Sequence, residues 1–225
     1  MVDTPQLASI AALVGDPSRG RMLSALMDGR ALTATELALE AGVTPSTASS
    51  HLSQLEGAGV VSMARHGRHR YFRIASAEVA SVFEALMGLA AHTGRRPRSA
   101  PGVPGMRRAR VCYDHLAGER GVQLLERLRS RGFLTASDET PELTIAGEAW
   151  CRAIGIDLDA LNSRRRPLCR PCLDWSERRT HLAGALGASI LERLFALRLA
   201  RREPGGRTVV FSPRGEAFLD RLEIR

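Results

Sequence analysis

The segment between residues 44 and 74 most restricts what this chain can fold into. Thr44-Pro45 is a strong helix start, because threonine can accept a hydrogen bond from a free backbone N–H and proline loses only an N–H that has no partner there. Gly57-Ala58-Gly59 ends that helix, and strand-like runs at residues 60–63 and 71–74 flank a turn at Gly67. The segment therefore predicts a helix followed directly by a β-hairpin.

Shorter helices are predicted before this segment. Apolar residues recur at helical spacing over residues 7–14 and again from residue 18, and Gly29 ends the second helix. A further short helix leads to the turn at Gly42-Val43. Helix, turn, helix and hairpin in this order indicate a winged helix-turn-helix, although each part alone is a weak signal.

The polar side chains of the helix after Pro45 are small, and no carboxylate occurs near its start. Such a helix can enter the major groove of DNA, because a carboxylate would repel phosphates and a bulky residue would hold the helix out. No acidic residue occurs between Glu56 and Glu78, whereas the hairpin tip is rich in arginine and histidine. We predict that the DNA-contacting residues are Thr44, Ser46, Thr47, Ser49, Ser50, His51, Gln54, Arg65, Arg68 and Arg70.

In this ordered combination, residues 5–92 resemble the arsenic-repressor-like (ArsR/SmtB) family of bacterial regulators. The resemblance implies that the helix after Pro45 enters the major groove and that the hairpin reaches the backbone or the minor groove. It also implies that the outer helices, residues 7–14 and 79–91, form a twofold dimer. The family's usual metal sites are not matched, since residues 36–41 contain no cysteine and residues 79–92 offer only Glu84 and His92 as ligands. The segments that carry the resemblance are residues 16–19, 35–38, 44–55, 58–61 and 67–74.

Composition favours a polyanionic partner. The net charge is +8 and the sequence pI is about 10.7, while the 4% aromatic content supplies few stacking platforms for single-stranded nucleic acid. Residues 79–92 form the longest apolar stretch, which is shorter than the roughly 20 residues of a membrane span. The N-terminus also has no secretory pattern. We therefore expect double-stranded DNA as the partner, no membrane association and a cytoplasmic location.

The second half of the chain contains an internal repeat. Residues 115–118 recur at 181–184 and residues 125–128 recur at 191–194, both at an offset of 66. We predict two copies of one winged-helix-like unit, each with two helices, a short hairpin and a final helix. The expected fold is mainly α with small β-hairpins (α+β), an N-terminal winged helix-turn-helix being followed by these two tandem repeats. The predicted domains are residues 1–92, an Arg/Pro/Gly-rich linker at 93–110, copy 1 at 111–162, a connector at 163–176 and copy 2 at 177–225.

The connector contains a Cys-x-x-Cys motif, Cys169 and Cys172, flanked by arginines. Neighbouring cations lower a thiol pKa, which suits a metal ligand or a redox-responsive thiol, and the spacing suits two ligands of a tetrahedral zinc site. Metal binding, thiol switching and no chemical role all stay open. A transition metal such as zinc is the candidate cofactor.

Two further metal ligands would have to come from elsewhere in the chain. The candidates by residue type are Cys112, His115, Asp174 and His181. At the offset of 66, Cys112 of copy 1 aligns with Arg178 of copy 2. Because the second copy has no cysteine at this position, Cys112 is not needed for the repeated fold. The recurrence of His115 at position 181 favours a shared packing or capping role over a ligand role.

No catalytic motif is present in the sequence, and an enzyme is not expected. The main hypothesis is a homodimeric, sequence-specific DNA-binding regulator, a repressor, which binds an inverted-repeat operator. Its C-terminal half would respond to a small effector or a metal. One alternative is a thiol-based redox or metal-binding protein that uses the winged helix for protein contacts. Another is an unspecific architectural DNA binder.

Overall fold

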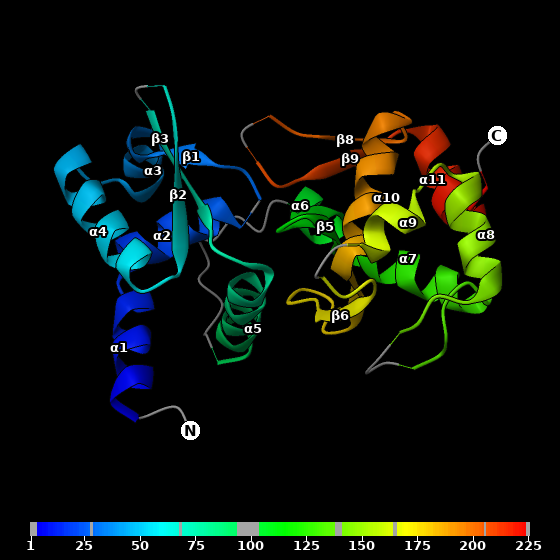
Figure 1. The fold of residues 1–225 in the computed structure, drawn as a ribbon, viewed down its shortest axis with the longest axis horizontal. Helices are drawn as coiled ribbons and strands as arrows, with labels where there is room; N and C mark the ends of the chain where they lie inside the picture. Colours follow the sequence, from blue (N-terminus) through cyan, green and yellow to red (C-terminus); the bar gives the residue numbers. More distant parts are fainter. Residues whose placement is uncertain are drawn as a thin grey trace. The chain divides into compact units, whose positions relative to one another are not determined.

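The computed structural model describes residues 4–27, 29–67, 69–93, 104–137, 141–163, 166–204 and 206–223 (Figure 1). The chain forms two compact units, Met1–Val82 and Phe83–Arg225. No helix within the described ranges is long and apolar enough to cross a membrane.

Four helices open the N-terminal unit, and their ends follow from local capping. The Asp16 carboxylate accepts hydrogen bonds from two backbone N–H groups at the start of α2. Thr33 and Glu36 form a reciprocal capping box on α3, and Gly42 ends α3 in the left-handed conformation. The helices are α1 (Thr4–Val14), α2 (Pro17–Leu26), α3 (Ala34–Ala41) and α4 (Pro45–Gly57).

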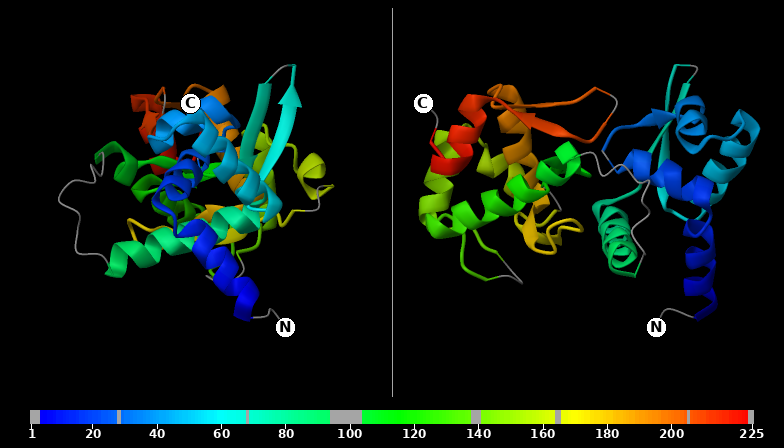
Figure 2. Two further views of the ribbon diagram at one scale, coloured as in Figure 1. Left: turned by 90° about the vertical axis from the view of Figure 1, so that its left-hand side faces the viewer. Right: turned by 180° about the vertical axis from the view of Figure 1, so that it is seen from behind.

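A three-stranded antiparallel sheet completes this winged helix, with strand order β1-β3-β2. The hairpin β2–β3 pairs residues 61–66 with residues 69–74, and Figure 2 shows it projecting from the helices of the unit. Leu23, Leu37, Leu52 and Phe72 are buried between helices and sheet. The predicted winged helix-turn-helix is therefore confirmed. The strands are β1 (Leu32–Thr33), β2 (Val61–His66) and β3 (His69–Ile74). Helix α5 (Ala77–Thr93) follows them and spans the boundary between the two units, which lies between Val82 and Phe83.

The C-terminal unit runs through similar elements twice. In each half, a hairpin leads into a helix, and a short β-pairing and a further helix follow, while the first half has an additional short helix at each of its ends. The first half contains α6 (Pro104–Arg108), β4 (Arg110–Cys112), β5 (His115–Ala117), α7 (Glu119–Ser130), α8 (Ile145–Ala153) and α9 (Leu158–Asn162). The second half contains β6 (Arg170–Leu173), β7 (Thr180–Ala183), α10 (Gly184–Ala196), β8 (Ala200–Arg202), β9 (Val209–Phe211) and α11 (Pro213–Arg221).

The expected first helix of each half is wrong, because a hairpin stands in its place. Strands β4 and β5 are only three residues long and buried throughout, so they show no alternation that periodicity could detect. Positive φ angles at Gly118 and Gly184, +81° and +87°, separate each hairpin from the helix after it. Strands β4 and β6 begin inside the stretches expected to be linker and connector, and residues 94–103 of that linker lie outside the described residues.

The two halves of the C-terminal unit are packed against each other reciprocally. Helix α7 packs on β7, and α10 packs on β5. A Cβ atom at Gly121 would lie 2.5 Å from a carbonyl oxygen of β5 and 3.5 Å from the Cβ of His181. At Gly187 the corresponding distances are 2.4 Å, to a carbonyl oxygen of β7, and 3.4 Å, to the Cβ of His115. Because only glycine permits this approach, both histidine-bearing strands lie close to the helix of the other half.

Candidate functional site

Helix α4 presents a small polar surface at its N-terminal end. Ser46, Thr47 and Ser50 are exposed, whereas Ala48 and Leu52 face the core. The Thr44 hydroxyl accepts a hydrogen bond from the Thr47 N–H at 3.2 Å, which fixes the first turn. The exposed hydroxyl groups of Ser46 and Ser50 can donate or accept hydrogen bonds, as contact with base edges requires.

Two of the polar side chains of α4 are engaged with α2. The Arg19 guanidinium donates to Gln54 Oε1 at 2.8 Å and lies 3.2 Å from His51 Nδ1. His51 Nε2 is also 3.8 Å from the Asp16 carboxylate. These contacts hold α4 against α2, so His51 and Gln54 have a structural role in the free protein.

The hairpin β2–β3 carries an unusual pairing at its tip. Arg65 and Arg70 are both exposed and lie directly opposite each other in the sheet, and His66 pairs with His69. Like charges in such a pair destabilise a sheet unless an anion lies close to them. The tip is therefore suited to a phosphate-bearing partner.

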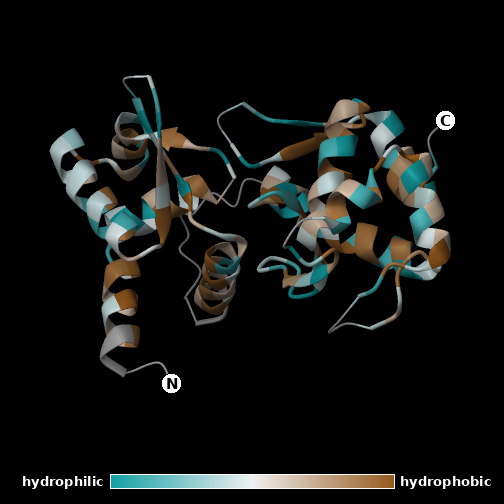
Figure 3. Ribbon diagram, in the orientation of Figure 1, coloured by the Kyte–Doolittle hydropathy of each residue, from teal (hydrophilic) through white to brown (hydrophobic). Residues whose placement is uncertain are grey.

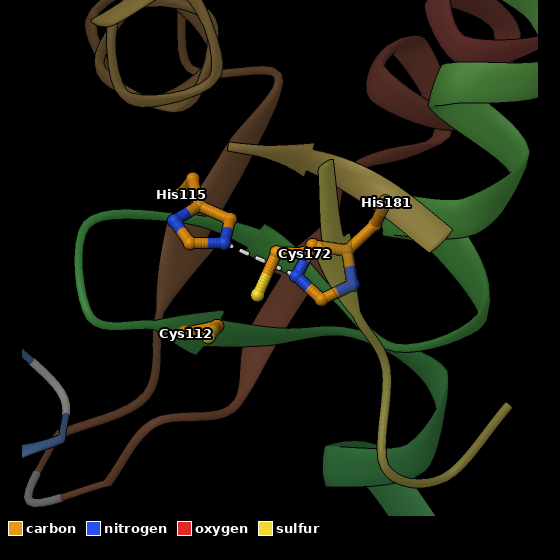
Figure 4. Close-up of side chains that lie close together, drawn as sticks. All are labelled: Cys112, His115, Cys172 and His181. Carbon is orange, nitrogen blue, oxygen red and sulfur yellow. Dashed lines mark hydrogen bonds between the residues drawn. The ribbon is translucent and has the colours of Figure 1, made fainter. Parts of the chain in front are cut away.

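A second group of interest lies inside the C-terminal unit, at the contact between its two hairpins. One sulfur or nitrogen atom from each of Cys112, His115, Cys172 and His181 lies within 4.8 Å of the others (Figure 4). These residues are only 1%, 5%, 8% and 0% exposed. Cys112 pairs with His115 across β4–β5, and Cys172 pairs with His181 across β6–β7, so each hairpin contributes one thiol and one imidazole.

Both imidazole rings are oriented by carboxylates. The Nε2 atoms of His115 and His181 face each other at 3.1 Å, as the dashed line in Figure 4 shows. On the other side of each ring, His115 Nδ1 lies 3.1 Å from Asp114 and His181 Nδ1 lies 3.3 Å from Asp174. The inward-facing atoms are therefore the two Nε2 nitrogens.

Asp174 holds this region together through several partners. Its buried carboxylate accepts hydrogen bonds from the Arg110 guanidinium at 3.0 Å, from the Gly118 N–H at 2.6 Å and from the Ser176 hydroxyl at 2.7 Å. The Arg110 side chain is fully buried and lies over the Trp175 ring, 4.5 Å from its centroid. A loop of the second half is thereby bonded to β4 and to the start of α7 in the first half.

The electrostatics of the group follow from these contacts. The pKa of the Cys172 thiol is well below its ordinary value, mainly because Cys112 donates a hydrogen bond to its sulfur, although burial acts in the opposite direction. The same hydrogen bond raises the pKa of Cys112. Burial would lower the pKa of His181, but hydrogen bonds with Asp174 and Cys172 outweigh it and raise that pKa to about 9.

Comparison with known proteins covers both units. The family model for bacterial regulatory proteins of the arsR family matches residues 16–63. The uncharacterized HTH-type transcriptional regulator YdfF of Bacillus subtilis is 39% identical over 223 residues, which cover 98% of this chain and 99% of that protein. The chain belongs to the ArsR family of HTH-type transcriptional regulators. This family and the relatives named here are transcriptional regulators rather than enzymes.

Two further similarities each cover less than half of this ArsR-family protein. The HTH-type transcriptional regulator CmtR of Mycobacterium tuberculosis is 36% identical over 81 residues, which cover 36% of this chain and 68% of that protein. A homodimeric winged helix-turn-helix DNA-binding domain (fragment 1–100) from Mycobacterium bovis, of a possible ArsR-family regulator, is 26% identical. It covers 41% of this chain and 90% of its own chain, with a TM-score of 0.37.

The predicted DNA-contacting residues occupy different environments in this ArsR-family protein. Those exposed to solvent are Thr44, Ser46, Thr47, Ser50, Gln54, Arg65 and Arg70. Ser49 and His51 are half-buried. Arg68 lies outside the described residues.

The structure separates the two cysteines of the Cys-x-x-Cys motif. Cys172 joins the Cys/His group, whereas Cys169 packs against the main hydrophobic core. Burial raises the pKa of Cys169 to about 11, so the expected effect of the neighbouring arginines does not prevail there. In Cys172 the lowered pKa comes first from Cys112 and then from the histidines.

The position of Cys112 in the repeat also needs correction. In the structure, the position equivalent to Cys112 in the second half is Cys172, not Arg178. Each cysteine lies opposite the repeated histidine across its own hairpin. The second hairpin loop is six residues longer, so the offset is 60 before the loop and 66 after it. An Arg-x-Cys-x-Asp pattern recurs at offset 60, in residues 110–114 and 170–174. This pattern is the sequence signal that would have found Asp114 and the cysteine pair.

Proposed function

We propose that this ArsR-family regulator is a homodimeric, sequence-specific repressor that binds an inverted-repeat operator in double-stranded DNA. The observation that carries the proposal is the pairing of an acid-free polar helix start on α4 with a hairpin tip whose opposed arginines, Arg65 and Arg70, are exposed. Hydroxyl groups on α4 suit base edges, and the arginines suit phosphates. A DNA partner would place the protein in the cytoplasm.

The proposed hairpin contact predicts a non-specific loss of affinity. Replacing Arg65 and Arg70 together by alanine will weaken binding to operator and unrelated duplexes by similar factors. Each lost phosphate contact lowers the slope of log K against log salt by about 0.9, so the double variant will have a slope smaller by roughly 2. Fluorescence anisotropy at several salt concentrations measures both quantities.

The matched control is Arg131→Ala, at an exposed position of the C-terminal unit. We expect it to leave the salt slope unchanged. An unchanged slope in the Arg65/Arg70 variant would contradict a phosphate contact by the hairpin. Selection of the unaltered protein on random duplexes that returned no motif would instead favour an architectural DNA binder. Turnover of a thiol substrate, with no footprint on promoter DNA, would favour the redox alternative.

Exposed apolar side chains support self-association. Val82, Leu86 and Leu89 lie at the spacing of one face of α5, and Leu7 and Ile10 of α1 are exposed as well. The ribbons of both helices contain hydrophobic segments, drawn in brown in Figure 3. Large apolar side chains that are exposed to solvent in a single chain are typical of an interaction surface. A twofold dimer would place two α4 helices in successive major grooves about 34 to 36 Å apart, which requires an inverted repeat.

Disrupting the exposed face of α5 is expected to dissociate the dimer. Leu86→Glu combined with Leu89→Glu will weaken dimerisation at least tenfold, since each buried leucine is worth roughly 1.5–3 kcal/mol. Analytical ultracentrifugation over a concentration series measures the dissociation constant. Leu39→Glu, at a position on α3 that is 84% exposed, is the control and should leave the dimer intact. Equal effects of the two variants would show that α5 is not the interface.

The C-terminal unit supplies the regulatory part of the proposed function. Its buried thiols and imidazoles are the groups on which a metal or a thiol oxidant would act. In this proposal, a small effector or metal that acts on the C-terminal unit changes the affinity of the dimer for its operator and thereby controls repression.

A further inference from the structure

We infer that Cys112, His115, Cys172 and His181 form a closed tetrahedral site for one divalent transition metal ion, zinc by preference, that joins the two halves of the C-terminal unit. The site belongs to that unit alone, so it does not depend on whether α4 reads DNA. Its four ligand atoms lie within 4.8 Å of one another. A zinc ion with ligands at about 2.0–2.3 Å would space them by roughly 3.3–3.8 Å, and small side-chain shifts achieve this.

The histidine geometry is that of metal ligands. A neutral imidazole that donates its Nδ1 hydrogen to a carboxylate has an unprotonated Nε2. Asp114 and Asp174 lie against the two Nδ1 atoms, so two Nε2 lone pairs would face each other at 3.1 Å. Such an arrangement needs a cation between the rings, either a proton or a metal ion. Carboxylate, imidazole and metal in this order is the usual outer arrangement of zinc-bound histidines.

The charges of the group favour a divalent ion. Two thiolates neutralise its charge, and the Asp174 carboxylate is already paired with Arg110 at 3.0 Å. Asp114 is likewise paired with Arg166, with Nη2 and Oδ1 3.1 Å apart. The buried carboxylate of Glu84, which interacts with Cys112, lies 3.7 Å from the Arg207 guanidinium. When two thiolates bind a divalent ion, each of these three carboxylates therefore still has a cationic partner. Two sulfur and two nitrogen donors select zinc over harder cations such as magnesium or calcium.

The distribution of ligands indicates what the ion would do. Each hairpin contributes one cysteine and one histidine, from strands separated by about 60 residues of chain. All four coordination positions are filled by buried side chains, which is typical of a structural zinc site rather than a catalytic one. Bound metal would hold the two halves of the unit together and raise its resistance to unfolding.

Cobalt binding to the full-length protein tests the inference. The chain is purified under reducing, oxygen-free conditions, stripped with a chelator and titrated with Co²⁺. We expect one ion per chain, the visible absorption of tetrahedral cobalt, thiolate-to-cobalt charge transfer, and displacement by Zn²⁺. Metal binding should also raise the midpoint of urea unfolding followed by the fluorescence of Trp150 and Trp175, which both lie in the C-terminal unit. Octahedral cobalt or no stoichiometric binding would overturn the inference.

Single substitutions identify the ligands. Cys112→Ser and Cys172→Ser will each lower cobalt affinity roughly 100-fold or more, and Asp114→Asn will lower it by about 10–100-fold through His115. Cys169→Ser is the matched control and should bind cobalt as the unaltered chain does. Equal losses in the Cys169 and Cys172 variants would overturn the four-residue site in favour of a Cys-x-x-Cys site.

A measurement on the unaltered chain covers the case in which a variant fails to fold. Stepwise modification of the four thiols of the zinc-loaded protein should release one zinc ion as two thiols react, and those two should be Cys112 and Cys172 by peptide mapping. Zinc release in step with the modification of Cys151 or Cys169, rather than with that of Cys112 and Cys172, would contradict the site. A Cys112–Cys172 disulfide in protein purified under reducing, oxygen-free conditions and then exposed to zinc would contradict it as well.

Discussion

Ser46→Glu combined with Thr47→Glu will abolish specific DNA binding without unfolding the protein. Both positions are exposed in the first turn of α4, where the proposed major-groove contact begins. Two carboxylates held against phosphates and base edges would cost several kcal/mol, which corresponds to at least about a 100-fold loss of affinity. Fluorescence anisotropy with operator DNA measures the loss.

The same two substitutions should leave the N-terminal unit stable or stabilise it slightly. Acidic side chains near a helix N-terminus contribute about 0.3–1 kcal/mol each. A glutamate at position 47, three residues after the N-cap Thr44, would form a capping box on α4 like the one that Thr33 and Glu36 form on α3. Thermal unfolding followed by circular dichroism checks this point. Loss of DNA binding with an unchanged or raised melting temperature would therefore reflect the interface itself.

The control for this pair is Ala136→Glu, which adds a carboxylate at an exposed position of the C-terminal unit. We expect operator affinity within about threefold of the unaltered protein, because the carboxylate lies outside the proposed interface. If the α4 double variant kept its affinity for operator DNA, the proposed role of α4 would be wrong. The Arg65 and Arg70 result would then have to be explained by a different surface.

Asp174→Ala will destabilise the C-terminal unit by about 3–5 kcal/mol, because it leaves the buried Arg110 guanidinium without its counter-charge. Both side chains are fully buried, and the Gly118 N–H loses its acceptor as well. A domain typically has only 5–15 kcal/mol of total stability, so the variant will be close to unfolding. Urea unfolding at one fixed metal concentration, followed by the fluorescence of Trp150 and Trp175, measures the change.

Asp157→Ala is the matched control in the same unit. Asp157 is exposed and accepts one hydrogen bond, from the Ala160 N–H at 3.0 Å at the start of α9. Loss of such a cap costs about 1 kcal/mol. Equal losses in the two aspartate variants would show that the Arg110–Asp174 pair contributes no more than a surface cap. Combining Asp174→Ala with Arg110→Met should recover part of the lost stability, since no unpaired charge is then buried.

The N-terminal unit was the more predictable half of the protein. Local sequence signals mark the ends of its helices, such as Thr44-Pro45 at the start of α4 and Gly42 at the end of α3. The hairpin follows from the strand-like runs and the turn at Gly67. These signals lie within a few residues of the structure that they specify, so no knowledge of distant contacts is needed to use them.

The C-terminal unit was harder to predict because its defining contacts are long-range. The repeat was visible at an offset of 66, but the six residues added in the second hairpin loop hid the correspondence of Cys112 with Cys172. The Cys-x-x-Cys motif predicted Cys169 as a metal ligand or reactive thiol, but Cys169 packs against the hydrophobic core and is not part of the Cys/His group. Spacing along the chain cannot show that neighbouring cysteines on a short segment face different surroundings.

The sequence by itself determined the winged helix-turn-helix, its polar helix and its basic hairpin tip. It also determined that the second half contains two related segments. Only the tertiary structure decided which thiols and imidazoles meet, because the meeting depends on the register of two short hairpins and on helices α7 and α10 crossing to the opposite half. Register and reciprocal packing bring together residues about 60 positions apart, and local backbone preferences carry no information about contacts at that range.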